Sequence, residues 1–259
     1  MKINLAHGAL HYTVSGEGEP VILLHGWGVD SKSFTPVHKF LERNFKVYSV
    51  DFPGFGESDE PPEQWGVDDY TEVLAQFIDE LGIENPILIG HSFGGRVSIV
   101  YASKYKKAKK LILAGSAGIK PKRKLNYYVK VYFYKTAKQV LRLPVLNKYR
   151  EEILAKIKGR TGSADYRQAS GVMQQTMVKV VNEDLQHLMP DVDVPVLLIY
   201  GENDTATPVA DGKRMEELMP DAGLVVLKNA GHYVFLDQLN QFNVIVDKFL
   251  EKDKGEPQK

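Results

Sequence analysis

The sequence predicts an α/β fold built on a doubly wound, mostly parallel sheet. One observation is a series of short apolar runs without polar alternation, which is typical of strands buried on both faces of a parallel sheet. A second is that segments with helical apolar spacing separate most of these runs by short loops. A third is a single long interruption of the alternation. Of the 259 residues, 43% are hydrophobic and 25% are charged, which is ordinary for a globular protein.

The strand pattern begins near the start of the chain. The segment 7–18, "HGALHYTVSGEG", is predicted to be a strand that pairs antiparallel at an edge of the sheet. Six later apolar runs have the length and composition of buried strands. They occupy residues 20–25, 45–52, 86–90, 110–116, 194–201 and 223–228.

Helical periodicity separates these runs. The segment 68–82 has apolar residues at Val73, Leu74, Phe77, Ile78 and Leu81, followed by a glycine stop. The same spacing predicts helices at 94–105, 209–220 and 240–252.

The alternation is interrupted between residues 118 and 189, where the pattern is helical and no strand is predicted. We interpret 1–118 and 190–259 as one core domain and 119–189 as a helical cap, or lid, inserted in it. Residues 119–167 contain nine Lys and five Arg against two Glu and one Asp, a net charge of +11. Such a charge is typical of solvated helix faces, and it also suits a lid that attracts acidic substrates.

Composition excludes several functional classes. The formal net charge is zero, so nothing draws the whole protein to nucleic acid or to a membrane surface. Cysteine is absent, which excludes disulfides, thiol nucleophiles and thiolate metal sites. No signal-peptide pattern or membrane-span-length apolar run is present, so we expect a soluble, cytoplasmic protein. Its oligomeric state is left open.

The strongest chemical motif is "GHSFG" at 90–94. It places Ser92 between two glycines, directly after a strand run and at the start of a predicted helix. This is the context in which G-x-S-x-G forms a nucleophile elbow. The glycines allow a sharp, strained turn that presents the hydroxyl near a helix N-terminus. The sequence therefore predicts Ser92 as a nucleophile.

A serine nucleophile needs a base, and the base needs an orienting carboxylate. Asp204 follows the fifth of the six strand runs, and His232 follows the sixth. These loops lie at the carboxyl edge of a parallel sheet, where α/β proteins build their sites. We therefore predict Asp204 and His232 as the partners of Ser92. His91 is not expected to be the base, because its side chain should point away from Ser92 at so sharp a turn.

The site also needs donors for an oxyanion. We predict that the backbone N–H groups of Trp27 and Phe93 supply them. Trp27 lies in "HGWG" at 25–28, where Gly28 allows a tight return. With the rings of Trp27 and Phe93, the side chains predicted to contact the substrate are those of Tyr128, Tyr132 and Val234.

These motifs together resemble the α/β-hydrolase superfamily over essentially the whole chain. The resemblance implies an eight-stranded, mostly parallel sheet flanked by helices, with a cap inserted after the sixth strand. It also implies a Ser–Asp–His triad, and the "DFPGFGES" loop is interpreted as structural. The matching segments are "HGWG" at 25–28, "DFPGFGES" at 51–58, "GHSFGG" at 90–95, "GENDTATP" at 201–208 and "AGH" at 230–232.

The resemblance leaves several activities open. Dehalogenases and epoxide hydrolases of this fold use an aspartate nucleophile, so Ser92 disfavours both. Esterases, enol-lactone hydrolases and meta-cleavage-product C–C hydrolases share the motifs of this chain. Aminopeptidases use acidic residues to hold an ammonium group, and Glu183 and Asp184 keep that alternative open.

We therefore predict a cofactor-free serine hydrolase that acts on a small carboxylic ester or lactone through an acyl-enzyme. The alternatives are a C–C hydrolase or an aminopeptidase with the same triad. From another class, a ligand-binding or signalling protein could keep the triad with slow turnover.

Other chemistries lack their motifs. His7 and His11 are four apart, but no glutamate follows His7 and Gly8 opposes a helix, so we expect no metal. No phosphate-binding glycine motif is present, so we expect no nucleotide cofactor. The tyrosines at 127–134 are interpreted as packing and pocket residues, and we expect a small acyl substrate and no nucleic-acid partner.

Overall fold

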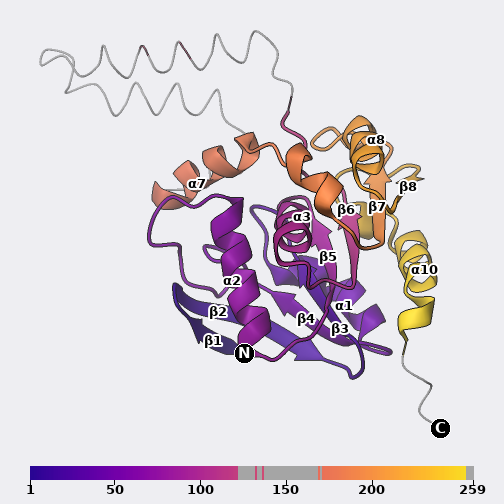
Figure 1. Ribbon diagram of the computed structural model, residues 1–259, viewed down its shortest axis with the longest axis horizontal. Coiled ribbons are helices and arrows are strands. Elements are labelled where there is room, and N and C mark those ends of the chain that lie inside the picture. The colour runs from indigo at the N-terminus through magenta and orange to yellow at the C-terminus, as the bar shows by residue number, and fades with distance from the viewer. Residues whose placement is uncertain (122–131, 133–135, 137–168, 170, 255–259) are drawn as a thin grey trace, which may run out of the picture.

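The computed structural model describes residues 1–121, 132, 136, 169 and 171–254. Its centre is one eight-stranded sheet in the order β1-β2-β4-β3-β5-β6-β7-β8, and Figure 1 shows it as a twisted layer between helices. β2 is antiparallel to both of its neighbours, and the other pairs are parallel. The strands are β1 (Lys2–Leu5), β2 (Gly8–Ser15), β3 (Pro20–Leu24), β4 (Lys46–Val50), β5 (Ile87–His91), β6 (Lys110–Ala114), β7 (Val196–Gly201) and β8 (Ala222–Leu227).

The central strands are apolar throughout because both of their faces are buried. In β3, Val21 and Leu23 enter one hydrophobic cluster, while Ile22 and Leu24 enter the other. This alternation follows from the two-residue period of a strand, which sends successive side chains to opposite faces. Two cores result, one on each side of the sheet.

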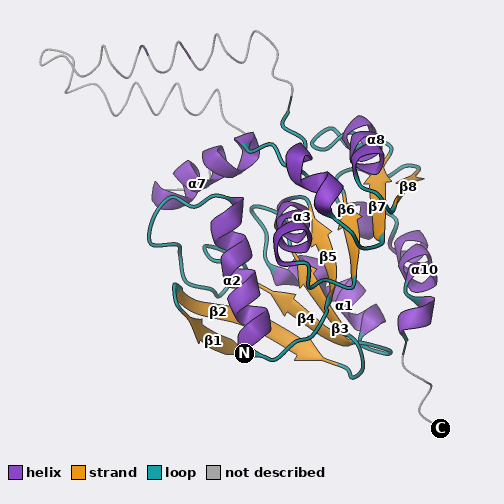
Figure 2. Cartoon of the chain, in the orientation of Figure 1, coloured by secondary structure: helices purple, strands orange, loops and turns teal. Residues whose placement is uncertain are grey.

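Helices cover both faces (Figure 2). The first core takes side chains from α2, α3 and α8, and the second takes them from α1, α9 and α10. The helices are α1 (Thr35–Leu41), α2 (Val67–Glu80), α3 (Phe93–Tyr105), α7 (Gly171–Asn182), α8 (Val209–Leu218), α9 (Val234–Asp237) and α10 (Leu239–Phe249).

The predicted fold class is confirmed, with two local differences. The strand predicted at the edge is β2, but β1 pairs outside it, so the edge prediction is wrong. β1 has only four residues of alternating exposure, and nothing in it resembles a buried strand. The helix α1 was not predicted, because it spans only seven residues.

The division into core and cap stays a prediction, since most of 119–189 lies outside the described residues. The part that is described contains α7 and the 3-10 helix η3 (Gln186–Asp191). Figure 1 shows α7 beside the start of α2, and there the Trp65 backbone N–H donates to Thr176 Oγ1 at 3.1 Å. Across residues 1–121 and 171–254, no helix combines the length and apolar character that crossing a membrane requires.

Candidate active site

Ser92 occupies the single residue between β5 and α3. Its backbone has φ +48° and ψ −104°, a strained conformation for a residue with a side chain. A Cβ on Gly94 would lie 2.0 Å from the Leu24 carbonyl oxygen, and one on Gly90 would lie 2.6 Å from the Gly94 carbonyl. The flanking glycines are therefore required by close backbone packing. The turn presents Ser92, which is partly exposed, at the start of α3.

The structure brings Asp204 and His232 into contact. Asp204 follows β7 and His232 follows β8, and Asp204 Oδ2 lies 2.8 Å from His232 Nδ1. Burial alone would raise the pKa of Asp204, but hydrogen bonds from His232 and Thr207 outweigh it, so the pKa is lowered. An ionised Asp204 accepts a hydrogen bond from Nδ1–H, which leaves Nε2 of a neutral ring as the acceptor.

The residue before Ser92, His91, contacts His232 and so brings Ser92 next to the Asp204–His232 pair. The His91 ring centroid is 4.7 Å from that of His232, and His91 Nε2 lies 3.0 Å from the His232 carbonyl oxygen. Burial, followed by the proximity of His232, lowers the pKa of His91 to about 3, so His91 is neutral and Nε2 donates. Within the described part of the chain, Ser92 Oγ and His232 Nε2 form no hydrogen bond.

The two predicted oxyanion donors are uncommitted. Among the residues that the structure describes, the backbone N–H groups of Trp27 and Phe93 donate to no protein acceptor. The first lies in the loop after β3, and the second is the first N–H of α3. Both groups are therefore available to a ligand oxygen.

The loop after β3 is fixed at both ends to residues 51 and 52. At its start, His25 Nε2 accepts from the Phe52 backbone N–H at 2.9 Å, and His25 Nδ1 donates to the Gly26 carbonyl at 2.7 Å. At its end, the Ser31 backbone N–H donates to Asp51 Oδ1 at 2.8 Å. These contacts hold the segment that carries the Trp27 N–H.

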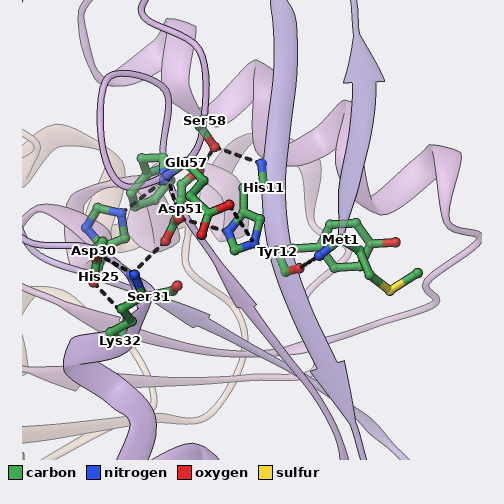
Figure 3. A network of polar contacts seen from close by, with 11 residues as sticks. Met1, His11, Tyr12, His25, Asp30, Ser31, Lys32, Asp51, Glu57 and Ser58 are labelled. Atoms are coloured by element: carbon green, nitrogen blue, oxygen red, sulfur yellow. Dashed lines mark hydrogen bonds and ion pairs between the residues drawn. The ribbon is translucent and has the colours of Figure 1, made fainter.

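Asp51 is the centre of this network, which Figure 3 shows. Its side chain is almost fully buried, and Oδ2 accepts from His11 Nδ1 at 2.9 Å and from the Glu57 backbone N–H at 3.0 Å. Burial opposes ionisation, but the hydrogen bonds from Ser31, Glu57 and His11 lower the pKa of Asp51 overall. The "DFPGFGES" loop therefore supports the loop of Trp27, in agreement with its structural interpretation.

The two residues that carry the backbone donors also have aromatic side chains that pack together. The partly buried Trp27 ring meets Phe55 at a centroid distance of 4.9 Å and Phe93 at 5.4 Å, both edge to face. Phe93 is only 3% exposed, so its ring packs beneath Trp27 and offers little surface to a ligand.

The other three residues predicted to contact the substrate differ in where the structure places them. Tyr128 lies outside the described residues, and Tyr132 is 66% exposed. Val234 is fully buried in the second core with Phe34 and Phe235. The prediction that Val234 contacts substrate is wrong, because α9 turns its side chain into the core.

Sequence reasoning did not include Thr207, whose hydroxyl contacts both Asp204 and His232. Asp204 Oδ1 accepts from the backbone N–H groups of Ala206 and Thr207 at 2.8 and 2.9 Å. This is the local turn that Asp favours, and an Asp with a Thr three residues later is a signal that could have pointed to it.

The chain is similar in sequence to known hydrolases over most of its length. Residues 19–239 match the family model described as alpha/beta hydrolase fold. A 2-hydroxy-6-oxononadienedioate/2-hydroxy-6-oxononatrienedioate hydrolase of Burkholderia vietnamiensis is 27% identical, over 94% of this chain and 91% of its own. A pimeloyl-[acyl-carrier protein] methyl ester esterase of Shewanella woodyi is 28% identical, over 94% and 98%.

A solved structure, the enol-lactonase from Burkholderia xenovorans LB400, superimposes with a TM-score of 0.76. It is 22% identical, and the match covers 97% of this chain and 100% of the lactonase chain. At this identity the likeness shows the shared fold.

Proposed function

The chain belongs to the alpha/beta hydrolase fold family, and within it we propose a cofactor-free serine hydrolase that acts on a small carboxylic ester or lactone. The observation that carries the proposal is the 2.8 Å contact between Asp204 and His232, beside a strained Ser92. Uncommitted backbone N–H groups at Trp27 and Phe93 add to it.

In the proposed mechanism, His232 Nε2 takes the hydroxyl proton of Ser92 as Oγ attacks the acyl carbonyl. Substrate binding draws Ser92 Oγ and His232 Nε2 together, since such contacts commonly tighten only in the complex. The N–H groups of Trp27 and Phe93 hold the oxyanion. The imidazolium then protonates the leaving alcohol, and the acyl-enzyme forms.

Deacylation repeats the cycle with water. His232 accepts a proton from the water as it attacks the acyl-enzyme, and returns it to Ser92 Oγ as the acid departs. Asp204 stays ionised throughout, holding the ring tautomer and stabilising the imidazolium. No step requires a metal or an organic cofactor.

The substrate class rests on the relatives and on the site together. The esterase relative acts on a methyl ester, and the lactonase has the same fold as this chain. In this chain, the partly buried rings of Trp27 and Phe55 pack against each other, and Trp27 also carries one of the two donors, so these rings suit a small apolar or aromatic group.

A panel of short p-nitrophenyl esters and lactones tests the proposal. We expect hydrolysis and rapid fluorophosphonate labelling by the unmodified protein, and loss of both in Ser92→Ala. Ser103→Ala is the matched control, because Ser103 is a buried serine whose hydroxyl donates to the Val100 carbonyl within α3. Ester hydrolysis retained by Ser92→Ala would overturn the mechanism.

The second candidate is hydrolysis of a C–C bond, favoured by the relative that acts on a dienedioate. The same triad residues would serve it. A dienol meta-cleavage substrate added to the panel separates the two, because cleavage of that bond removes its colour and also releases a carboxylic acid.

The aminopeptidase alternative depends on two acidic residues, and one of them, Glu183, already has a partner in the fold. The Glu183 carboxylate accepts from the Val67 backbone N–H, with both oxygens at 3.3 Å, and is half buried between α7 and α2. It is therefore engaged at the start of α2. A slow-turnover binding protein would instead show weak fluorophosphonate labelling, together with ligand-induced stabilisation and no product.

A further inference from the structure

The hydroxyl of Thr207 lies where three strand ends converge. Thr207 Oγ1 is 2.9 Å from the Gly115 carbonyl oxygen after β6, and 2.8 Å from Asp204 Oδ2 after β7. It is also 3.2 Å from His232 Nδ1, after β8. The residue is 6% exposed, so water contributes little to these contacts.

The two carboxylate oxygens of Asp204 are held by different kinds of group. Oδ1 accepts two backbone N–H groups, from Ala206 and Thr207, which are fixed by the turn itself. Oδ2 accepts only side-chain donors in the described structure, and these are His232 Nδ1 and the Thr207 hydroxyl. An ionised carboxylate has about four acceptor sites, so these four donors saturate it.

We infer that Thr207 is a positioning residue that orients the Asp204 carboxylate toward His232. The inference rests on the proposed function. Its hydroxyl and His232 Nδ1 are both 2.8 Å from Oδ2 and 3.2 Å from each other, so the oxygen that serves the base has a second donor directly beside the imidazole. Without the hydroxyl, Oδ2 is held by His232 alone, and the two side chains can move together.

The Gly115 carbonyl gives the hydroxyl a fixed anchor. Gly115 has φ +49°, and a Cβ there would lie 3.0 Å from the His232 carbonyl oxygen and 3.3 Å from Asp204 Oδ2. Gly115 therefore packs directly against both partners. Because the hydroxyl has one hydrogen and lies within hydrogen-bond distance of both the Gly115 carbonyl oxygen and Oδ2, that hydrogen is shared between the two acceptors.

Thr207→Val tests the inference, because valine keeps the shape and the backbone N–H to Oδ1 but lacks the hydroxyl. We expect kcat for a p-nitrophenyl ester and the rate of fluorophosphonate labelling at Ser92 to fall about tenfold, as for loss of one hydrogen bond to a charged group, with KM within about twofold. Thr207→Ser restores the hydroxyl and should stay within about threefold of the unmodified protein.

Thr71→Val is the matched control for removing a buried threonine hydroxyl. Thr71 is 1% exposed, and its Oγ1 donates to the Val67 carbonyl at 2.8 Å in α2. We expect it to lower stability but to leave the labelling rate unchanged. If Thr207→Val does not fold, Thr207→Ser and Thr207→Ala provide the comparison, since they differ by one oxygen atom.

The outcomes separate the two proposals. If the unmodified protein is not labelled at Ser92, the proposed function fails and this inference fails with it. If the unmodified protein is labelled and Thr207→Val reacts as fast, only the positioning role is wrong. Equal slowing in the serine and valine variants would also overturn it, because the hydroxyl would then be irrelevant.

Discussion

Two Asp–His pairs are built on the same sheet, and their contact distances are almost the same. Asp204 Oδ2 lies 2.8 Å from His232 Nδ1, and Asp51 Oδ2 lies 2.9 Å from His11 Nδ1. Both carboxylates are buried, and hydrogen bonds lower the pKa of each despite that burial.

The pairs differ in what the other ring nitrogen faces. His11 Nε2 faces the Glu57 carboxylate at 3.9 Å, so acids bracket that ring on both sides. His232 has a carboxylate on one side only among the described residues, and it packs against His91, which precedes Ser92. An Asp–His contact therefore does not by itself define a catalytic site. The group that faces the second ring nitrogen distinguishes a structural histidine from one that can act as a base.

The same substitution in both histidines is expected to give the largest difference between the two pairs. We expect His232→Gln to lower kcat for an ester about 10⁵-fold or more, because the base is lost. His11→Gln should leave kcat within about threefold, since its ring holds a structural loop. Similar losses in both variants, measured by initial rates on folded protein, would contradict the distinction.

The aspartates give the next largest effect. Asp204→Asn should lower kcat about 10⁴-fold with little change in stability, because the amide favours the wrong tautomer of His232. Asp51→Asn should cost about 2 kcal/mol of unfolding free energy by leaving a donor unsatisfied. It should lower kcat by no more than about tenfold, because it loosens the loop that carries the Trp27 N–H but leaves the Asp204–His232 pair intact. Urea denaturation and ester kinetics on both variants test these expectations. A 10⁴-fold loss of kcat in Asp51→Asn would refute the structural role of Asp51.

A glycine tests how tightly the Asp51 network is packed. Gly56 has φ +56°, and a Cβ there would lie 2.1 Å from Asp51 Oδ2. We expect Gly56→Ala to cost about 3 kcal/mol of unfolding free energy, from backbone strain and displacement of the carboxylate.

Gly82→Ala is its control, because Gly82 has φ +61° but no atom within 4 Å of the added Cβ. It should cost about 1 kcal/mol, from backbone strain alone. Equal costs in the two variants, measured by urea denaturation, would show that the Asp51 network yields to the added methyl group.

Acidification is expected to lower stability by less than Gly56→Ala does. The pKa of His91 is about 3 in the fold against 6.5 for the free side chain, so between these values the unfolded chain binds a proton that the folded protein does not. Stability therefore falls as the pH drops below 6.5, and His91 should account for about 2 kcal/mol of the loss at pH 5.

His91→Gln should show a correspondingly smaller loss of unfolding free energy between pH 7.5 and pH 5, and the exposed His187→Gln is the control. Burial lowers the pKa of His25 also, so the start of the loop after β3 shares this acid sensitivity. An unchanged pH dependence in His91→Gln would show that His91 does not titrate in this way.

Much of this arrangement follows from local sequence, because parallel strands all end at one edge. That rule placed Asp204 and His232 in neighbouring loops, and the glycines around Ser92 marked the strained turn. The contact between His11 and Asp51 could not be predicted, since it depends on how β2 aligns with β4. Val234 was misplaced for a similar reason, because the direction of a four-residue helix is set by the core it joins.

The hydrogen bond between His91 and the His232 carbonyl spans 141 positions of the chain. A contact of such sequence separation closes slowly, because the chain entropy of a long loop is lost before the contact stabilises anything. A chain that ended after α8 would hold the nucleophile and the acid but no base. The rate at which a refolding sample regains reactivity at Ser92 would therefore time the docking of β8.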